Sequence, residues 1–145
     1  MPAQEVHFRS ARELRKILDE VMKDIDSDPD DGPRMRGAAG PLRMEFTDLK
    51  LVFNLARADD GNLEWDFSKR SSKQPKLALS MSSDFGNRLL QGRENPAIAI
   101  ARGRLHTKVV DAGAALRFFP AAKPLFARYR ELVAEKYPHL ALGPE

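Results

Sequence analysis

The sequence predicts an α+β fold, an α/β sandwich in which one face of a five-stranded, mainly antiparallel sheet is covered by about five helices. Three observations carry this prediction. An amphipathic helical stripe comes first, a run with alternating polarity starts at Pro41, and short segments with helix caps and stops follow. A chain of 145 residues with 42% apolar content corresponds to one domain with a sizeable core.

The first helix is predicted to begin after Ser10, which forms a capping box with Glu13. Apolar residues then recur at the spacing of one helix face, while most charged residues lie off that face. The stripe consists of Leu14, Ile17, Leu18, Val21, Met22 and Ile25.

An acidic segment follows this helix. Asp26, Asp28 and Asp30 stand at alternate positions, as in a calcium loop. The sixth position is Asp31 rather than glycine, and the twelfth is Gly37 rather than glutamate. We therefore expect an acidic linker through residue 40 instead of a calcium site.

From Pro41 the apolar residues recur with a period of two, which is typical of strands. The turn residues at 59–62 suit a hairpin. Four strands with one apolar face each predict an antiparallel sheet covered on one side. Their apolar positions are Leu42, Met44 and Phe46, then Leu51, Phe53 and Leu55, then Leu63, Trp65 and Phe67, and finally Leu77, Leu79 and Met81.

Caps and stops define the remaining elements. Ser83 and Asn95 are predicted helix caps, and Gly92 and Gly103 are predicted stops. The expected elements are helices over 84–91 and 96–102, a fifth strand over 105–109, and helices over 112–119 and 124–136. We assign residues 1–40 to the first helix and linker, 41–120 to the core, and 121–145 to a C-terminal helix of the same single domain.

The net charge of +3 is too small to indicate nucleic-acid binding. Residues 1–72 carry 12 basic and 15 acidic groups, a net −3, and residues 73–145 carry 12 and 6, a net +6. A basic C-terminal half suits transient contact with an anionic membrane, although solvated helix faces are the favoured explanation.

Several function classes are excluded by what the chain lacks. It has no cysteine, no Walker loop, no nucleophile elbow, no secretory signal and no run of 18 apolar residues, so we expect a cytoplasmic protein. The enzymatic alternative is a small enzyme that uses His106 with a nearby carboxylate.

Residues 84–105 contain the pattern Gly-x-x-Asn-Pro-x-x-Ala-x-x-x-Gly-Arg-Leu, and this run resembles the sterol carrier protein-2 family. The matching residues are Gly92, Asn95, Pro96, Ala99, Gly103, Arg104 and Leu105. The order of elements over about 40–120 is similar as well. Arginine outnumbers lysine 15 to 9, which favours a bacterial member.

This resemblance implies a non-catalytic intracellular lipid-binding protein whose helices and sheet enclose an apolar tunnel. The implied ligand is a fatty acid, a fatty acyl-CoA or a sterol-like molecule, and no cofactor is implied. The alternative is an accessory subunit that presents an apolar intermediate to a lipid- or steroid-degrading enzyme or to a quinone-biosynthesis enzyme.

The short helices and the strands supply the residues that we expect to line the ligand cavity. The final helix is predicted to act either as a lid or as a homodimer contact. The predicted ligand-binding residues are Trp65, Phe67, Phe85, Leu89, Leu90, Ile98, Leu105, Leu116, Phe119, Leu125, Phe126 and Tyr129.

Overall fold

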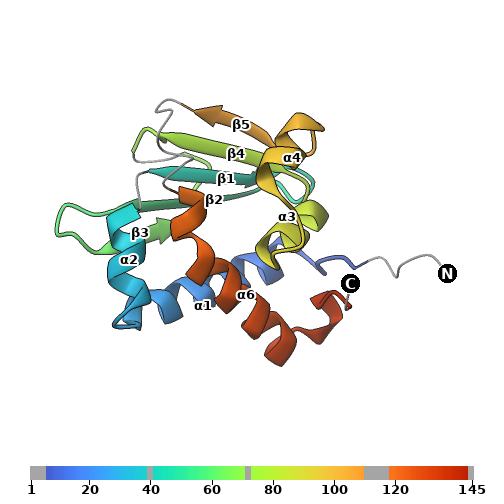
Figure 1. Cartoon of the computed structure of the whole chain (residues 1–145), viewed down its shortest axis with the longest axis horizontal. Coiled ribbons are helices and arrows are strands. Elements are labelled where there is room, and N and C mark those ends of the chain that lie inside the picture. The colour runs from blue at the N-terminus through green and yellow to red at the C-terminus, as the bar shows by residue number, and fades with distance from the viewer. Residues whose placement is uncertain (1–5, 39–40, 71–72, 110–117, 144–145) are drawn as a thin grey trace.

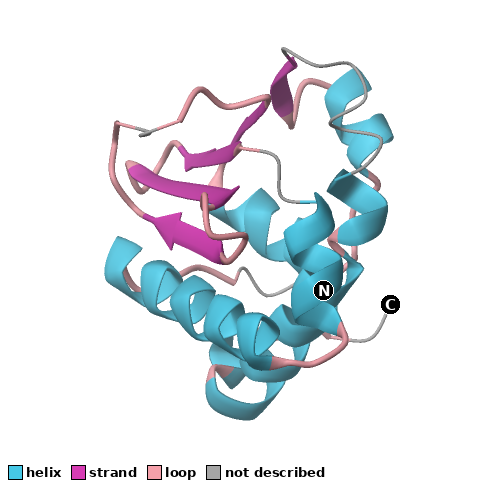
Figure 2. Cartoon of the chain, turned by 90° about the vertical axis from the view of Figure 1, so that its left-hand side faces the viewer, coloured by secondary structure: helices cyan, strands magenta, loops and turns pink. Residues whose placement is uncertain are grey.

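The N-terminal and C-terminal helices pack against each other on the same side of a five-stranded sheet (Figure 1). The computed structural model describes residues 6–38, 41–70, 73–109 and 118–143. Viewed from the side, the strands form one layer and the helices lie against one face of it and below it (Figure 2). The predicted α+β class, with helices on one face of a sheet, is therefore confirmed.

Helix α1 (Ala11–Ser27) follows the predicted stripe, and all six stripe residues are fully buried. Ser10 Oγ accepts a hydrogen bond from the backbone N–H of Glu13 at 3.2 Å, which confirms the predicted cap. The Glu13 side chain completes the cap by accepting from the backbone N–H of Arg9 at 2.9 Å. Each stripe residue removes apolar area from water, so the burial of this face holds α1 in place.

The predicted acidic linker is wrong for residues 31–38, which form helix α2 (Asp31–Ala38). This helix has no apolar stripe, so the spacing of its apolar residues does not predict it. Its start is held by Asp28, whose carboxylate accepts from the backbone N–H groups of Asp30 and Asp31 at 2.8 and 2.9 Å. Those two hydrogen bonds, together with the ion pair to Arg128 at 3.0 Å, hold the pKa of Asp28 below its usual value.

The sheet has the strand order β3-β2-β1-β4-β5, and three of its four pairings are antiparallel, as predicted. The β1/β4 pairing is parallel, so the antiparallel arrangement predicted for the first four strands is wrong at that position. The β2–β3 hairpin takes the place on one side of β1, and the chain then returns to the other side of β1. The strands are β1 (Leu42–Phe46), β2 (Leu51–Arg57), β3 (Leu63–Asp66), β4 (Leu77–Met81) and β5 (His106–Val109).

The strand register places the predicted apolar positions on one face, under the helices. The nine apolar residues of β1, β2 and β4 on this face are each at most 8% exposed. They are Leu42, Met44, Phe46, Leu51, Phe53, Leu55, Leu77, Leu79 and Met81. Strand β2 is buried on its other face too, because the chain after β3 folds over it: Asn54 Nδ2 donates to Ser68 O at 2.8 Å.

Two short helices follow β4. Helix α3 (Ser83–Leu90) is capped by Ser82, not by the predicted Ser83, because Ser82 Oγ accepts from the Phe85 N–H at 3.2 Å. Ser83 instead donates from its N–H and its hydroxyl to the Asp48 carboxylate, at 2.7 and 2.6 Å. The predicted stop at Gly92 is confirmed by its φ of +77°, a conformation that glycine adopts without strain.

Helix α4 (Pro96–Ala101) begins as predicted. Asn95 Oδ1 accepts from the N–H groups of Ala97 and Ile98 at 2.9 and 3.2 Å. Gly103, with φ +73°, lets the chain turn out of the helix into β5.

The C-terminal part contains helix α6 (Lys123–Lys136) and the short 3₁₀ helix η1 (Pro138–Leu140). The N–H of Tyr137 still bonds to Val133 O at 2.9 Å, and the helix stops there as predicted. The helix predicted over 112–119 lies outside the described residues up to residue 117. Residues 118–121 are helical, so the chain remains helical one residue beyond the stop expected at Pro120.

Candidate functional site

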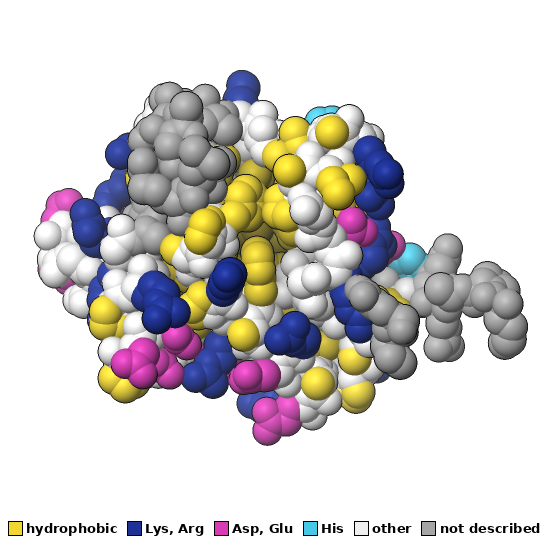
Figure 3. Space-filling model, in the orientation of Figure 1, with side chains coloured by type: hydrophobic (Ala, Val, Ile, Leu, Met, Phe, Trp, Pro, Cys, Tyr) yellow, Lys and Arg dark blue, Asp and Glu magenta, His cyan; other side chains and the backbone are white. Residues whose placement is uncertain are grey.

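The helix-covered side of the molecule has a hollow with apolar side chains at its base (Figure 3). Comparison with Figure 1 places this hollow over the middle of the sheet, between α3 and α4 on one side and the start of α6 on the other. Charged side chains lie around it on the outer surface (Figure 3). An apolar recess within a charged surface is typical of a site for an apolar molecule.

Phe126 of α6 was predicted to line the ligand cavity, and the contacts of its neighbours show which way it faces. Arg128, two residues later, points to the opposite side, since its guanidinium bonds to Asp28 beside α2 at 3.0 Å. Arg130, one turn after Phe126, lies near Gly92 at the end of α3, with Nη1 3.8 Å from the point where a Cβ on that glycine would stand. Phe126 therefore lies on the face of α6 that turns toward α3, and it is only partly buried.

The predicted residues of α3 and α4 differ in exposure. Phe85, Leu89 and Leu90 of α3 are 2%, 1% and 0% exposed, and Leu105 is 1% exposed. Ile98 of α4 is 50% exposed, so half of its surface is open to solvent. Most of this set packs in the core beside the hollow, and Ile98 lies at the molecular surface.

Trp65 and Phe67 lie at the other edge of the sheet, beside α1. Trp65 is on the covered face, and its indole N–H donates to the Asp19 carboxylate at 2.9 Å. That hydrogen bond is the main reason why the pKa of Asp19 is below its usual value of 3.8. Phe67 packs on Phe53, with ring centroids 5.6 Å apart, and lies under the Arg15 guanidinium at 5.0 Å.

Tyr129 is fully buried between α6 and α3. Its hydroxyl donates to Asn87 Oδ1 at 2.7 Å, and Asn87 and Gln91 donate to the carbonyl of Leu140 at 3.0 and 2.9 Å. Burial, and secondarily the charge of Glu13, raises the pKa of Tyr129 far above its usual value of 10.0. This hydrogen-bond network fastens the C-terminal segment to α3.

The other residues predicted from the C-terminal region are Leu116, Phe119 and Leu125. Leu116 lies outside the described residues. Leu125 is fully buried on α6. Phe119 is partly buried, and its ring meets the buried ring of Phe118 edge-on, with centroids 5.5 Å apart. Whether each of these side chains contacts a ligand stays a prediction.

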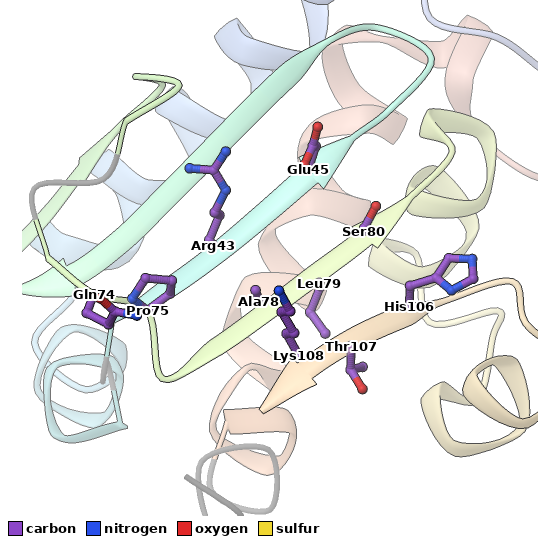
Figure 4. A pocket seen from close by; sticks show the side chains of 10 residues that line it. All are labelled: Arg43, Glu45, Gln74, Pro75, Ala78, Leu79, Ser80, His106, Thr107 and Lys108. Atoms are coloured by element: carbon purple, nitrogen blue, oxygen red, sulfur yellow. The ribbon is translucent and has the colours of Figure 1, made fainter. Parts of the chain in front are cut away.

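The uncovered face of the sheet has a separate depression of about 570 Å³ along β4 (Figure 4). Small residues of β4 lie between longer side chains of β1 and β5, and the register aligns Glu45, Ser80 and His106 in one row. In a Ser–His–carboxylate triad the histidine stands between the other two groups, whereas the serine does so here. Among the described residues, no hydrogen bond joins these three side chains. This row does not have the geometry of a hydrolytic triad.

A charged cluster covers one end of α3. Glu94, whose side chain is only 14% exposed, pairs with Arg88 at 3.0 Å and with Arg104 at 3.4 Å. Both guanidinium groups lie 5.8 Å from the centroid of the Phe85 ring. The cluster holds the α3–α4 connection in place and leaves one net positive charge at the surface.

The described residues contain neither a metal-binding cluster nor a membrane-spanning helix. No group of three or more histidine, aspartate or glutamate side chains is positioned to hold a metal ion in the described part of the chain. No helix among the same residues combines the length and apolarity needed to span a membrane.

Asn87, Gln91 and Asp48 were not predicted from the sequence. The helical spacing of four between Asn87 and Gln91 was a usable signal, because it places two amides on one face of α3. The acceptor that they share, the carbonyl of Leu140, is about 50 residues away, and no local pattern indicates it.

The arrangement of this sheet and its helices is that of the sterol carrier protein-2 domains, which confirms the fold that the resemblance implied. The sterol carrier protein 2 of Yarrowia lipolytica, in its apo form, superposes with a TM-score of 0.59 at 15% identity over 79% of this chain and 100% of that one. The sterol carrier protein domain 2 of Helicoverpa armigera gives a TM-score of 0.57 at 12% identity, over 77% and 87%. The ubiquinone synthesis protein UbiJ-SCP2 gives 0.56 at 14% identity, over 77% and 88%.

A larger enzyme contains the same fold as one part. The inverting sec-alkylsulfatase Pisa1 from Pseudomonas sp. matches 63% of this chain with a TM-score of 0.51 and 18% identity, but this chain spans only 14% of that enzyme's length. No family model matches the chain, and no curated protein matches it.

Proposed function

We propose that this protein is a non-catalytic carrier, located in the cytoplasm, that binds a fatty acid, a fatty acyl-CoA or a sterol-like molecule. The observation that supports the proposal is the apolar hollow between α3–α4 and the start of α6 (Figure 3). The ligand's apolar part would lie on the covered face of the sheet, and Phe126 and Phe119 would contact it from the C-terminal side.

Burial of the ligand supplies the affinity in this proposal. Each buried methylene contributes about 0.8 kcal/mol, so a chain of about 16 carbons gains on the order of 12 kcal/mol before losses. Lost translational and conformational freedom removes a large part of that gain. Micromolar binding then needs only an apolar recess of suitable shape, so several ligands with similar chains would bind with similar affinity.

A second candidate function is that of an accessory subunit which holds an apolar intermediate for a partner enzyme. The fold likeness to UbiJ-SCP2, which is named a ubiquinone synthesis protein, favours this alternative over other non-carrier roles. The two candidates share the hollow, and they differ in whether the protein purifies bound to an enzyme or bound to a lipid alone.

The test begins with native mass spectrometry of the purified protein, followed by solvent extraction and identification of what it carries. Delipidated protein is then titrated with a fluorescent fatty acid. In this proposal Phe126 lies at the wall of the hollow, so a Phe126→Gln variant would place an amide there. We expect about tenfold weaker binding because the amide is desolvated without a partner.

The matched control is Ala134→Gln, which puts the same side chain at an exposed position of α6. This control should bind like the wild type. A protein that carries no lipid, takes up no fatty acid and remains folded would refute the carrier proposal. Binding by Phe126→Gln that is as tight as binding by the control would show that Phe126 is not at the site.

A further inference from the structure

Helix α4 carries apolar side chains outward. Its sequence is Pro-Ala-Ile-Ala-Ile-Ala, with no polar or charged residue. Ile98 is 50% exposed and Ile100 is 41% exposed, and they are the large apolar residues with the most exposed surface in the described part of the chain. Ala97 and Ala101 are exposed too, and Ala99 is the residue that anchors the helix to the core at 0% exposure.

Single exposed apolar residues are common on protein surfaces and need no explanation. Here two isoleucines and two alanines share one six-residue helix, so their exposed surfaces adjoin and form one apolar knob. Figure 3 shows apolar side chains at the surface in this region, above and to the right of the hollow. A contiguous apolar surface of this kind indicates a contact with an apolar partner.

The chain segment that contains the knob is basic. Residues 88–108 carry five basic groups and one acidic group, a net charge of +4, while the whole chain carries +3. The single acidic residue, Glu94, is largely buried and already paired with Arg88 and Arg104. Arg102, at the end of α4, is exposed and has no ion pair with any described residue.

An apolar knob with a basic rim complements the surface of an anionic bilayer. Isoleucine side chains enter the boundary between headgroups and acyl chains, and arginine side chains bind the phosphates around them. A folded protein partner with an apolar pocket would not require the excess of positive charge. Charge complementarity therefore favours a membrane over such a partner.

We propose that α4, with Arg102 and Arg104, is a docking surface for anionic phospholipid membranes. The knob lies beside the hollow, so docking would bring the bilayer close to the hollow, and an apolar ligand would pass between them with little exposure to water. This inference rests on the proposed function for the identity of that ligand, but docking itself is measured without any ligand.

The test is co-sedimentation with large unilamellar vesicles of phosphatidylcholine alone or of phosphatidylcholine with 30% phosphatidylglycerol, about 0.1 M salt being present. We expect the wild type to bind the anionic vesicles at least tenfold more tightly than the neutral ones. The Ile98→Ser, Ile100→Ser double variant should bind the anionic vesicles about tenfold more weakly. Both substitutions are at exposed positions, and circular dichroism checks that the variant is folded.

A charge variant distinguishes docking through α4 from non-specific electrostatic attraction to the vesicles. Arg102→Gln, Arg104→Gln should weaken anionic binding several-fold and reduce its dependence on salt. The control Arg12→Gln, Lys16→Gln removes two exposed charges from the outer face of α1 and should change binding much less. Equal effects of both charge variants, or unchanged binding of the isoleucine variant, would overturn the proposal.

Three further outcomes are distinguishable. If the isoleucine variant alters self-association in size-exclusion chromatography with light scattering and leaves vesicle binding intact, α4 is a contact between two copies of the chain and the proposal is wrong. If the protein takes up a dissolved fluorescent fatty acid but does not bind vesicles, the docking inference fails and the carrier function stands. If the protein binds vesicles through α4 but takes up no ligand, the docking inference stands and the carrier function fails.

Discussion

Gly86 sets how closely α3 approaches the sheet, and replacing it by alanine is the sharpest test of that packing. A Cβ at Gly86 would stand 2.6 Å from Cε1 of Phe46, 3.1 Å from its Cδ1 and 3.4 Å from Sδ of Met81. The favourable distance between two carbon atoms is about 3.5–4.0 Å, so the first contact overlaps by about 1 Å. Phe46 is 0% exposed and its ring has no free space to enter.

Two opposing effects determine the size of the change. Alanine in place of glycine stabilises a helix interior by about 0.5–1 kcal/mol. Overpacking a filled core costs about 1–3 kcal/mol. We therefore expect Gly86→Ala to lower the free energy of unfolding by about 1 kcal/mol. Urea unfolding can be followed by the fluorescence of Trp65, the single tryptophan of the chain.

The matched control is Gly37→Ala, since Gly37 is also helical and a Cβ there would meet nothing within 4 Å. That variant should be as stable as the wild type or slightly more stable. Phe46→Leu combined with Gly86→Ala should show a favourable coupling of about 1 kcal/mol, because the smaller side chain relieves the overlap. A Gly86→Ala protein as stable as the Gly37→Ala protein would refute the close approach of α3.

Two further predictions concern the buried and partly buried hydrogen bonds. Tyr129→Phe should destabilise the protein by about 1 kcal/mol at pH 7. The pKa of Tyr129 in the folded protein lies above its usual value of 10.0, so its contribution to stability is complete below pH 10 and decreases above it. In urea unfolding near pH 10.5, the difference in stability between variant and wild type should therefore be smaller than at pH 7. A constant difference would contradict this. Trp65→Phe removes the hydrogen-bond donor to Asp19, whose pKa is lowered in the folded state. The destabilisation caused by this substitution should be largest above pH 4 and should decline as the carboxylate is protonated. A destabilisation independent of pH would show that the packing of the indole, rather than its N–H, is what matters.

The local features of the fold were predictable because each depends on a few neighbouring residues. The caps at Ser10 and Asn95 and the stops at Gly92 and Gly103 depend on the chemistry of one turn. The capping role given to Ser83 was one residue off, because Ser82 and Ser83 are both suitable caps, and the choice depends on the distant carboxylate of Asp48.

The strand order was not predictable in the same way. An apolar face shows that a strand is covered, and it does not show which strand lies beside it. The parallel β1/β4 pairing joins residues 35 positions apart, such as Leu42 and Leu77. Helix α2 escaped detection for a different reason: its residues include Gly32, Pro33 and Gly37, and its stability depends on the Asp28 cap and on neighbouring α1.

The candidate site was also predictable in its local features and not in its long-range arrangement. The apolar residues of α3 and α6 were predicted as a group because helical spacing identifies their faces, and these helices do flank the hollow (Figure 3). Trp65 and Phe67 were grouped with them because an alternating strand does not reveal its place in the sheet. The order β3-β2-β1-β4-β5 puts both residues at the edge beside α1.

The packing of α1 against α6 has a consequence for the order in which the protein can be completed during translation. The apolar stripe of α1 leaves the ribosome early, and a large part of its final partner surface, on α6, is synthesised about 100 residues later. At about 5–20 residues per second, the stripe stays without that partner for roughly 5–20 seconds. During this interval the nascent chain presents a continuous apolar helix face, which is the kind of surface that chaperones bind.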